Sequence, residues 1–151
     1  MSMLRIALAH IKLLARALHT LSLSSTTERN AMPYLARADY AKPIVGNGEC
    51  VTLVRHLTGA RASSLWREGD KVPDLLEKGG MSKGTVIATF VNGRYQNPRL
   101  GNHAALFIRQ VPGGIEIFDQ WPDHKPGARV IYFGRSAAGA SNRPELYSVV
   151  E

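Results

Sequence analysis

The stretch from Gly46 to Leu57 constrains the fold more than any other part of the chain. It opens with a glycine-punctuated turn and continues into apolar residues at three-residue steps, after which Gly59 follows as a helix stop. This pattern predicts a short core helix that begins at Cys50, the only cysteine in the protein. A thiol at a helix N-terminus faces unpaired backbone N–H groups and the positive end of the helix dipole, and both favour the reactive thiolate. A lone cysteine is more often a small buried apolar side chain, so position alone leaves both interpretations open.

Composition limits the classes of protein to which the chain can belong. A length of 151 residues with 44% hydrophobic residues predicts one soluble domain that is large enough to bury a core. One cysteine excludes an internal disulfide, so the fold does not require an oxidising compartment. The net charge of +7 suits an anionic partner such as nucleic acid, a membrane surface or bacterial cell wall. Because the Lys and Arg residues are scattered and form no basic run with aromatics between them, we do not expect nucleic acid to be a partner.

The first 31 residues differ in pattern from the rest, which predicts a boundary between residues 1–31 and residues 32–151. Apolar residues recur there at helical spacing with basic residues largely on the other side, and a polar stretch follows at 22–30, as in a basic amphipathic helix with a linker. The basic residues interrupt any apolar run of secretory length, and the segment is too polar to span a bilayer. A binding arm, a packed extra helix and an extension upstream of a true start at Met32 all fit. We favour a peripheral element that takes no part in the chemistry.

Residues 32–151 carry the pattern of an α+β domain. Glycine and proline turns separate runs rich in β-branched and apolar residues, and Asn92-Gly93 is the strongest hairpin signal in the chain. Residues 61–76 are predicted to form a loop with a helical turn. Helices followed by hairpin-linked strands predict an α+β arrangement with an antiparallel sheet of about five strands. The predicted strands are 85–91, 103–110, 115–121, 129–133 and 146–150.

Two polar residues fall where the predicted sheet would bring them together. His103 begins one strand and Asp119 ends the next, and a tight turn joins the two strands. In an antiparallel hairpin the start of one strand lies beside the end of its neighbour, so these side chains can meet. With Cys50 they would form a cysteine protease-type site, in which the imidazole takes the thiol proton and the carboxylate fixes its tautomer. Each of the three also fits an ordinary turn or core position when it is taken alone.

Gln120 is the other candidate to orient His103, and strand alternation distinguishes it from Asp119. Side chains alternate between the two faces of a strand, so only one of the two can point toward the histidine. Apolar residues share the face of Asp119 at 115 and 117, whereas Gln120 shares its face with residues 116 and 118. This favours Asp119 as the covered residue and therefore as the partner of His103.

A zinc site built from Cys50, His103, Asp119 and His124 is an alternative use of the same residues. Zinc sites usually contain a pair of ligands at short sequence spacing, and the chain has no such pair. We therefore predict a site with neither metal nor cofactor.

Four stretches in order resemble the motifs of papain-like bacterial cell-wall amidases, the CHAP group and its NlpC-type relatives. Gly48–Val54 resembles their cysteine motif, and Gly84–Phe90 is similar to the strand that precedes their histidine. Gly101–Phe107 matches their glycine-x-histidine strand, and Asp119–Trp121 resembles the stretch that supplies their third polar residue. The resemblance covers roughly residues 40–125 and implies a papain-like fold, in which N-terminal helices pack on the antiparallel sheet. It extends to a group of small proteobacterial proteins and, more distantly, to the amidase effectors of type VI secretion.

Two residues depart from the pattern of these families. Glu49 stands where many CHAP sequences have glutamine, and Thr85 replaces the usual aspartate of the strand before the histidine. The change at Glu49 matters more, because an acid that pointed toward the nucleophile would oppose thiolate formation.

The resemblance implies a cysteine amidase or peptidase that hydrolyses amide bonds in peptidoglycan stem peptides with Cys50, His103 and Asp119. Its substrate would be peptidoglycan or a muropeptide, its partners would include an immunity or inhibitor protein, and we expect a monomer. With no convincing signal peptide, action in the periplasm or on the cell wall would follow delivery by a dedicated secretion route. A catalytically silent papain-like domain that binds cell wall or a protein partner is the alternative. The candidate substrate-binding residues, of which the three aromatic ones also fit core or rim positions, are Tyr40, Trp66, Gln120 and Trp121.

Overall fold

The structure is a computed structural model, and it describes residues 32–36, 43–96, 101–135 and 139–151. These residues belong to one unit that spans Ala31–Glu151. The predictions made for residues 1–31 and for Tyr40 lie outside the described residues. Within the described ranges, no helix is long and apolar enough to cross a membrane.

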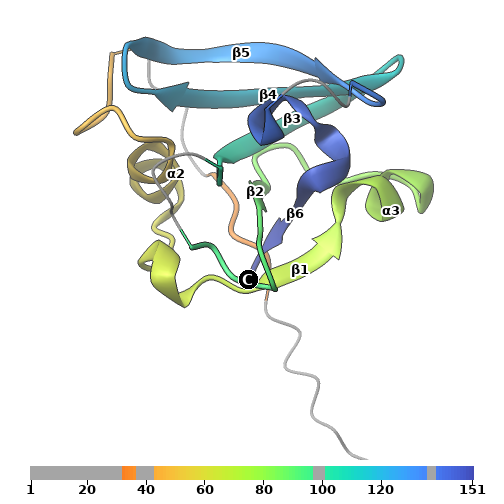
Figure 1. Cartoon of the computed structure of the whole chain (residues 1–151), viewed down its shortest axis with the longest axis horizontal. Helices are drawn as coiled ribbons and strands as arrows, with labels where there is room; N and C mark the ends of the chain where they lie inside the picture. Colours follow the sequence, from red (N-terminus) through yellow and green to blue (C-terminus); the bar gives the residue numbers. More distant parts are fainter. Residues whose placement is uncertain (1–31, 37–42, 97–100, 136–138) are drawn as a thin grey trace, which may run out of the picture. The chain divides into compact units, whose positions relative to one another are not determined.

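Six strands form a single antiparallel sheet in the order β1-β6-β2-β3-β4-β5 (Figure 1). The sheet and its few helices confirm the predicted α+β class. Hairpins join β3 to β4 and β4 to β5. The last strand, β6, lies between β1 and β2. The strand bounds are β1 Glu68–Lys71, β2 Val86–Thr89, β3 Ala104–Val111, β4 Gly114–Trp121, β5 His124–Tyr132 and β6 Tyr147–Val150.

The prediction was wrong about the two edges of the sheet. β1 lies within a segment predicted to be loop, because its charged sequence shows no apolar alternation; backbone pairing of Glu68 with Val150 holds it against β6. β5 begins at His124, five residues before the predicted start at Arg129. It includes Pro126, which an edge strand tolerates because one side of its backbone has no partner strand.

The described α-helices are α2 (Cys50–Thr58) and α3 (Val72–Glu77). The predicted start of α2 at Cys50 is confirmed, and so is its end, where Gly59 adopts the left-handed conformation with a φ of 72°. Gly59 donates its N–H to the carbonyl of Arg55, which is the usual way in which a glycine closes a helix. Short 3₁₀ turns lie at Ser63–Leu65, Ala140–Asn142 and Pro144–Leu146.

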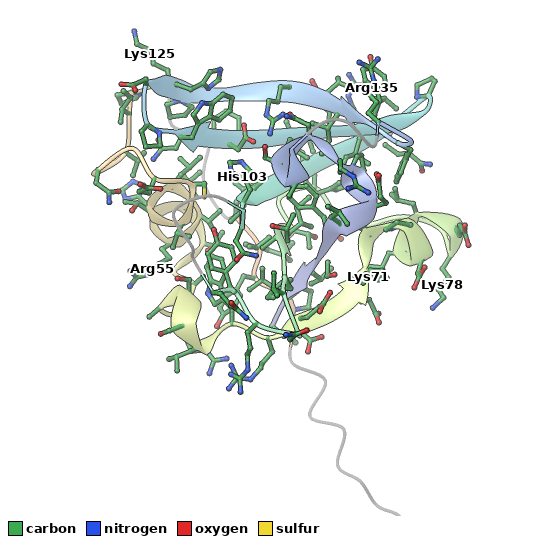
Figure 2. All side chains as sticks on the ribbon, viewed as in Figure 1. Arg55, Lys71, Lys78, His103, Lys125 and Arg135 are labelled. Carbon is green, nitrogen blue, oxygen red and sulfur yellow. The ribbon has the colours of Figure 1, made fainter. Side chains whose placement is uncertain are left out.

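The sheet is covered on both faces, and this divides the core in two. One cluster joins Leu53 and Val54 of α2 to residues of β2, β3 and β4 that share a face, such as Leu106 and Phe118. The other cluster joins Val72 of α3 to residues on the opposite face of the same strands. Side chains fill the space between α2 and the sheet, with His103 among them, while Lys78, Lys125 and Arg135 lie at different edges of the molecule (Figure 2).

Replacing Gly114 with alanine should destabilise the fold. A Cβ atom at this position would lie 2.2 Å from the backbone oxygen of Ile131, and a backbone atom cannot move aside without disturbing the β4–β5 pairing. We expect Gly114→Ala to lower the free energy of unfolding by about 2 kcal/mol or more. Gly127→Ala is the matched control, because its Cβ would meet only an oxygen of Lys125 at 3.8 Å. Urea denaturation of both variants checks the prediction, and equal losses would contradict it.

Candidate active site

The turn before α2 is built so that Cys50 becomes the first residue of the helix. Gly46 has a φ of +56°, and a Cβ there would lie 2.6 Å from the Cγ2 of Thr52, so only glycine fits without a shift. The side-chain oxygen of Asn47 accepts hydrogen bonds from the Glu49 N–H at 3.2 Å and from the Thr52 hydroxyl at 2.7 Å. These contacts hold the first turn of the helix in place of a capping side chain at Glu49.

Gln120 fastens this turn to the sheet. Its Oε1 accepts a hydrogen bond from the Val45 N–H at 3.1 Å, and its Nε2 donates to the carbonyls of Val45 at 2.9 Å and Glu49 at 3.0 Å. The side chain is fully buried, so these bonds replace the water that its amide would otherwise contact. The residue before the cysteine is thus fixed relative to β4.

The end of β2 positions His103. Thr89 accepts the His103 N–H on its hydroxyl oxygen at 2.9 Å and donates its own N–H to the His103 carbonyl at 2.9 Å. The side-chain amide of Asn102 donates to the Thr89 carbonyl at 2.7 Å. The backbone of this segment is therefore held on both sides of the histidine, and the ring can turn only about its own side-chain bonds.

The His103 ring meets Asp119 across the β3–β4 hairpin, where its Nε2 lies 2.7 Å from the carboxylate Oδ2. Asp119 is fully buried, and it also receives the guanidinium of Arg129, with Nη2 at 2.8 Å from Oδ2 and Nε at 3.1 Å from Oδ1. Arg129 was not singled out from the sequence. The signal for it would have been the register of β5, which places a long cation diagonally across from the acid.

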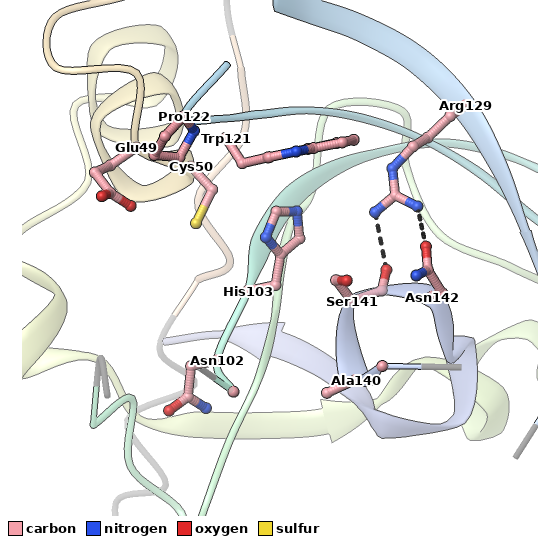
Figure 3. Close-up of a pocket in the computed structure, with 12 residues that line it drawn as sticks. Glu49, Cys50, Asn102, His103, Trp121, Pro122, Arg129, Ala140, Ser141 and Asn142 are labelled. Atoms are coloured by element: carbon pink, nitrogen blue, oxygen red, sulfur yellow. Dashed lines mark hydrogen bonds between the residues drawn. The ribbon is translucent and has the colours of Figure 1, made fainter. Parts of the chain in front are cut away.

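Cys50 lies at the N-terminal end of α2 with its sulfur directed toward the His103 ring (Figure 3). Burial raises the pKa of the thiol, but the hydrogen bond and positive charge of His103, helped by Tyr95 and the Ala104 backbone, lower it below its usual value overall. Burial likewise opposes a charged His103, yet hydrogen bonds to Asp119 and Cys50 and the charges of both raise its pKa to about 9. These directions favour a thiolate and an imidazolium at neutral pH.

The carboxylate behind the histidine is held in its charged form. Burial raises the pKa of Asp119, but hydrogen bonds from His103 and Arg129, together with their positive charges, lower it below its usual value overall. In this ionisation state the site contains four groups of alternating charge: the thiolate, the imidazolium, the carboxylate and the guanidinium. Their formal charges cancel, which reduces the cost of burying them.

A pocket of about 690 Å³ opens over the sulfur and the histidine. Glu49 lies at its edge with an exposed side chain, and Trp121 and Arg129 line it from β4 and β5 (Figure 3). Arg129 donates to the Ser141 carbonyl at 2.9 Å and to the side-chain oxygen of Asn142, so the same cation holds this wall of the pocket. The remaining lining residues are Gly101, Asn102, Pro122, Gly139 and Ala140.

The four candidate substrate-binding residues differ in whether they line the pocket. Trp121 lines the pocket with 37% of its surface exposed, and its ring stacks on that of His124 at 3.7 Å. Trp66 is fully buried and donates its indole N–H to the Arg61 carbonyl, so it packs in the core and does not line the pocket. Gln120 is also fully buried and serves as the tether described above. Tyr40 lies outside the described residues.

The zinc alternative needs several ligands at one point. Among the residues that the structure describes, no group of three or more His, Cys, Asp or Glu side chains could hold a metal ion. His124 instead stacks on Trp121, away from the pair formed by His103 and Asp119.

Comparisons with known proteins agree with this architecture. A model of the family described as domesticated amidase effector 2 matches residues 23–149. The chain belongs to this family. A type VI secretion amidase effector 2 protein of Salmonella typhi is 39% identical over 136 residues, which cover 80% of this chain and 100% of that protein. Domesticated amidase effector 2 of Ixodes scapularis is 32% identical over 108 residues, which cover 70% of this chain and 72% of that protein.

A solved structure of this group has the same fold. Type 6 secretion amidase effector 2 (Tae2) superposes with a TM-score of 0.67 at 37% identity, and the match covers 80% of this chain and 95% of that chain. Membership of the domesticated amidase effector 2 family confirms the resemblance to papain-like amidases, and the likeness to Tae2 confirms the papain-like α+β fold.

Asp119→Asn should remove one of the two groups that raise the pKa of His103. The variant keeps the shape of the side chain but loses its charge, so only Cys50 still opposes the effect of burial, and we expect the pKa to fall from about 9. Titration of His103 by NMR measures this change. Asp123→Asn makes the same chemical change in the exposed β4–β5 turn and should leave His103 unaffected. A pKa in Asp119→Asn that stays at the wild-type value would show that Asp119 does not hold the imidazolium.

Proposed function

We propose that this family member is a cysteine amidase that hydrolyses amide bonds in peptidoglycan stem peptides. One observation carries the proposal: the sulfur of Cys50 points at a histidine whose other ring nitrogen is held by a buried carboxylate, and both Cys50 and His103 line one pocket. Nucleophile, base and orienting acid in this order are the parts that acyl transfer requires. Residues 32–151 would form the catalytic domain.

The first half of the reaction would begin from the ion pair. The Cys50 thiolate attacks the carbonyl carbon of the substrate amide, and the carbonyl oxygen takes up the negative charge. The backbone N–H of Cys50, in the first turn of α2, has no intrahelical acceptor and suits this oxyanion. His103 then donates its proton to the amide nitrogen, the carbon–nitrogen bond breaks, and the amine leaves an acyl group bound to sulfur.

The second half would use the same residues in reverse. His103, now neutral, takes a proton from a water molecule as the oxygen attacks the thioester. The carbon–sulfur bond breaks, the carboxylic acid product leaves, and the thiolate and imidazolium are restored. Asp119 keeps the Nδ1 side of the ring toward sulfur throughout, because its own bond occupies Nε2.

The relatives and motifs of the chain, its net charge and the shape of its pocket all support this substrate class. The relatives are named as amidase effectors, and the sequence motifs resemble those of cell-wall amidases. The net charge of +7 favours association with an anionic polymer. The pocket is open and holds an exposed aromatic face, Trp121, beside the nucleophile, which suits an extended peptide better than a small buried ligand. An immunity protein would act most simply by covering this pocket.

Cys50→Ala should abolish hydrolysis of purified peptidoglycan. Removal of a nucleophile typically lowers kcat by about 10³-fold or more, whereas loss of one sulfur from the core costs only about 1–2 kcal/mol of stability. Separation of the soluble products by chromatography, with circular dichroism as the check on folding, tests this. Wild-type protein alkylated with iodoacetamide is a second inactive control, since the chain has one thiol. A folded variant with wild-type turnover would refute the role of Cys50.

The pH dependence of kcat/KM should follow the ion pair. The active form is lost on the acid side when the thiolate takes a proton, below the lowered pKa of Cys50. It is lost on the alkaline side when the imidazolium gives up its proton, near the pKa of about 9 of His103. We therefore expect kcat/KM to fall near pH 9 on the alkaline side, with an acid limb that lies below the ordinary pKa of cysteine. A neutral imidazole acting as base on a thiol would instead give an acid limb near pH 6.5, which is the usual pKa of histidine.

A further inference from the structure

Tyr95 contacts Cys50, although it is not one of the four charged groups of the site described above. Its hydroxyl oxygen lies 3.6 Å from the Cys50 sulfur, within hydrogen-bond distance for sulfur. The residue is 4% exposed and belongs to the same buried cluster as Cys50, and it is not one of the described residues that line the pocket. Tyr95 therefore reaches the sulfur from within the core.

The Asn92-Gly93 turn brings Tyr95 close to the Cys50 sulfur. Asn92 and Gly93 have φ values of 51° and 70°, and Val91 and Arg94 exchange backbone hydrogen bonds at 3.0 and 3.1 Å around them. This is the tight turn that Asn-Gly favours, and it reverses the chain directly before Tyr95.

Two aromatic rings fix the orientation of the phenol. The Trp66 ring meets that of Tyr95 edge-on with centroids 5.1 Å apart, and the Phe90 ring does so at 6.4 Å. Trp66 is itself immobilised, because it is fully buried and its indole N–H is bonded to the Arg61 carbonyl. A hydroxyl on so restricted a ring is already placed before any substrate binds.

The direction of the hydrogen bond follows from the protonation of its two partners. Burial raises the pKa of Tyr95 well above its usual value, and the negative charge of Cys50 raises it further, so the phenol keeps its proton at neutral pH. A thiolate can only accept. The O–H of Tyr95 is therefore the donor whenever Cys50 is ionised.

The other groups that act on the Cys50 sulfur are His103 and the Ala104 backbone. Among the described residues, His103, directly before β3, supplies the positive charge that acts on the sulfur, and Asp119 and Arg129 lie behind the ring. Glu49, next in the chain, has an exposed side chain, and Tyr147 of β6 is fully buried.

We propose that Tyr95 is a further catalytic residue, which donates a hydrogen bond to the Cys50 thiolate and stabilises the ionised nucleophile. The inference rests on the proposed role of Cys50. It assigns a function to the Asn92-Gly93 turn, which holds the donor, and to Trp66, which orients it.

Tyr95→Phe removes the hydroxyl and keeps the ring. The rate of iodoacetamide alkylation as a function of pH reports the ionisation of Cys50 without ambiguity, because the chain has a single cysteine. Loss of one hydrogen bond to a charged group should raise the midpoint by about one pH unit, which corresponds to about tenfold less thiolate on its acid side. The acid limb of kcat/KM should move by the same amount. Tyr34→Phe is the matched control, since the Tyr34 hydroxyl accepts from Arg61 at 2.9 Å and should leave the midpoint unchanged.

A second substitution tests the same bond in the opposite direction. Site-specific 3-fluorotyrosine at position 95 makes the phenol more acidic and hence a stronger donor, so the alkylation midpoint should fall. This result also decides the question if Tyr95→Phe fails to fold, as judged by circular dichroism. A midpoint that stays at the wild-type value in folded Tyr95→Phe, or that does not fall with the fluorinated ring, overturns the proposal. Because alkylation needs no substrate, these outcomes are independent of whether the protein hydrolyses peptidoglycan.

Discussion

The buried carboxylate of Asp119 is the group on which the rest of the site depends. It accepts from His103 on one side and from Arg129 on the other, and no part of it is exposed to solvent. A lone carboxylate in this position would take up a proton to escape burial, and it could then no longer hold an imidazolium. Arg129 prevents this, because its paired N–H groups compensate for the water that the carboxylate has lost. The charge of His103, and through it the ionisation of Cys50, follows from this pairing.

β4 organises both halves of the site because its side chains alternate between the two faces of the sheet. Ile115 and Ile117 pack on the face toward α3, and Asp119, two residues further along the strand, binds His103. Phe118 and Gln120 share the face toward α2, where Phe118 packs in the cluster of Cys50 and Gln120 binds the turn before it. Adjacent residues of one strand thus position His103 and the turn before Cys50. A slip of one residue in its register would reverse these roles.

The sequence was informative wherever a local pattern determines structure, and less so where distant segments meet. The start of α2, its glycine end and the Asn92-Gly93 turn are set by short-range chemistry, and all three were predicted. The neighbourhood of His103 and Asp119 followed from hairpin geometry alone. Arg129 and Tyr95 were missed because each reaches the site through the tertiary packing of another strand or turn, for which the sequence has no periodic signal. β1 was missed for a similar reason, since backbone pairing with β6 and not apolar alternation makes it a strand.

Arg129 also joins the chemistry of the site to the shape of its pocket. The guanidinium that neutralises Asp119 donates in addition to Ser141 and Asn142, which form one wall of the pocket, and it lies over the Trp121 ring at 5.3 Å. Lysine could supply the charge but not these simultaneous contacts, because it lacks the planar fork of donors. Asp119, the pocket wall formed by Ser141 and Asn142, and the Trp121 ring therefore share one cation. A change that displaced the wall would also withdraw donors from Asp119, so pocket shape and the pKa of His103 are coupled through a single side chain.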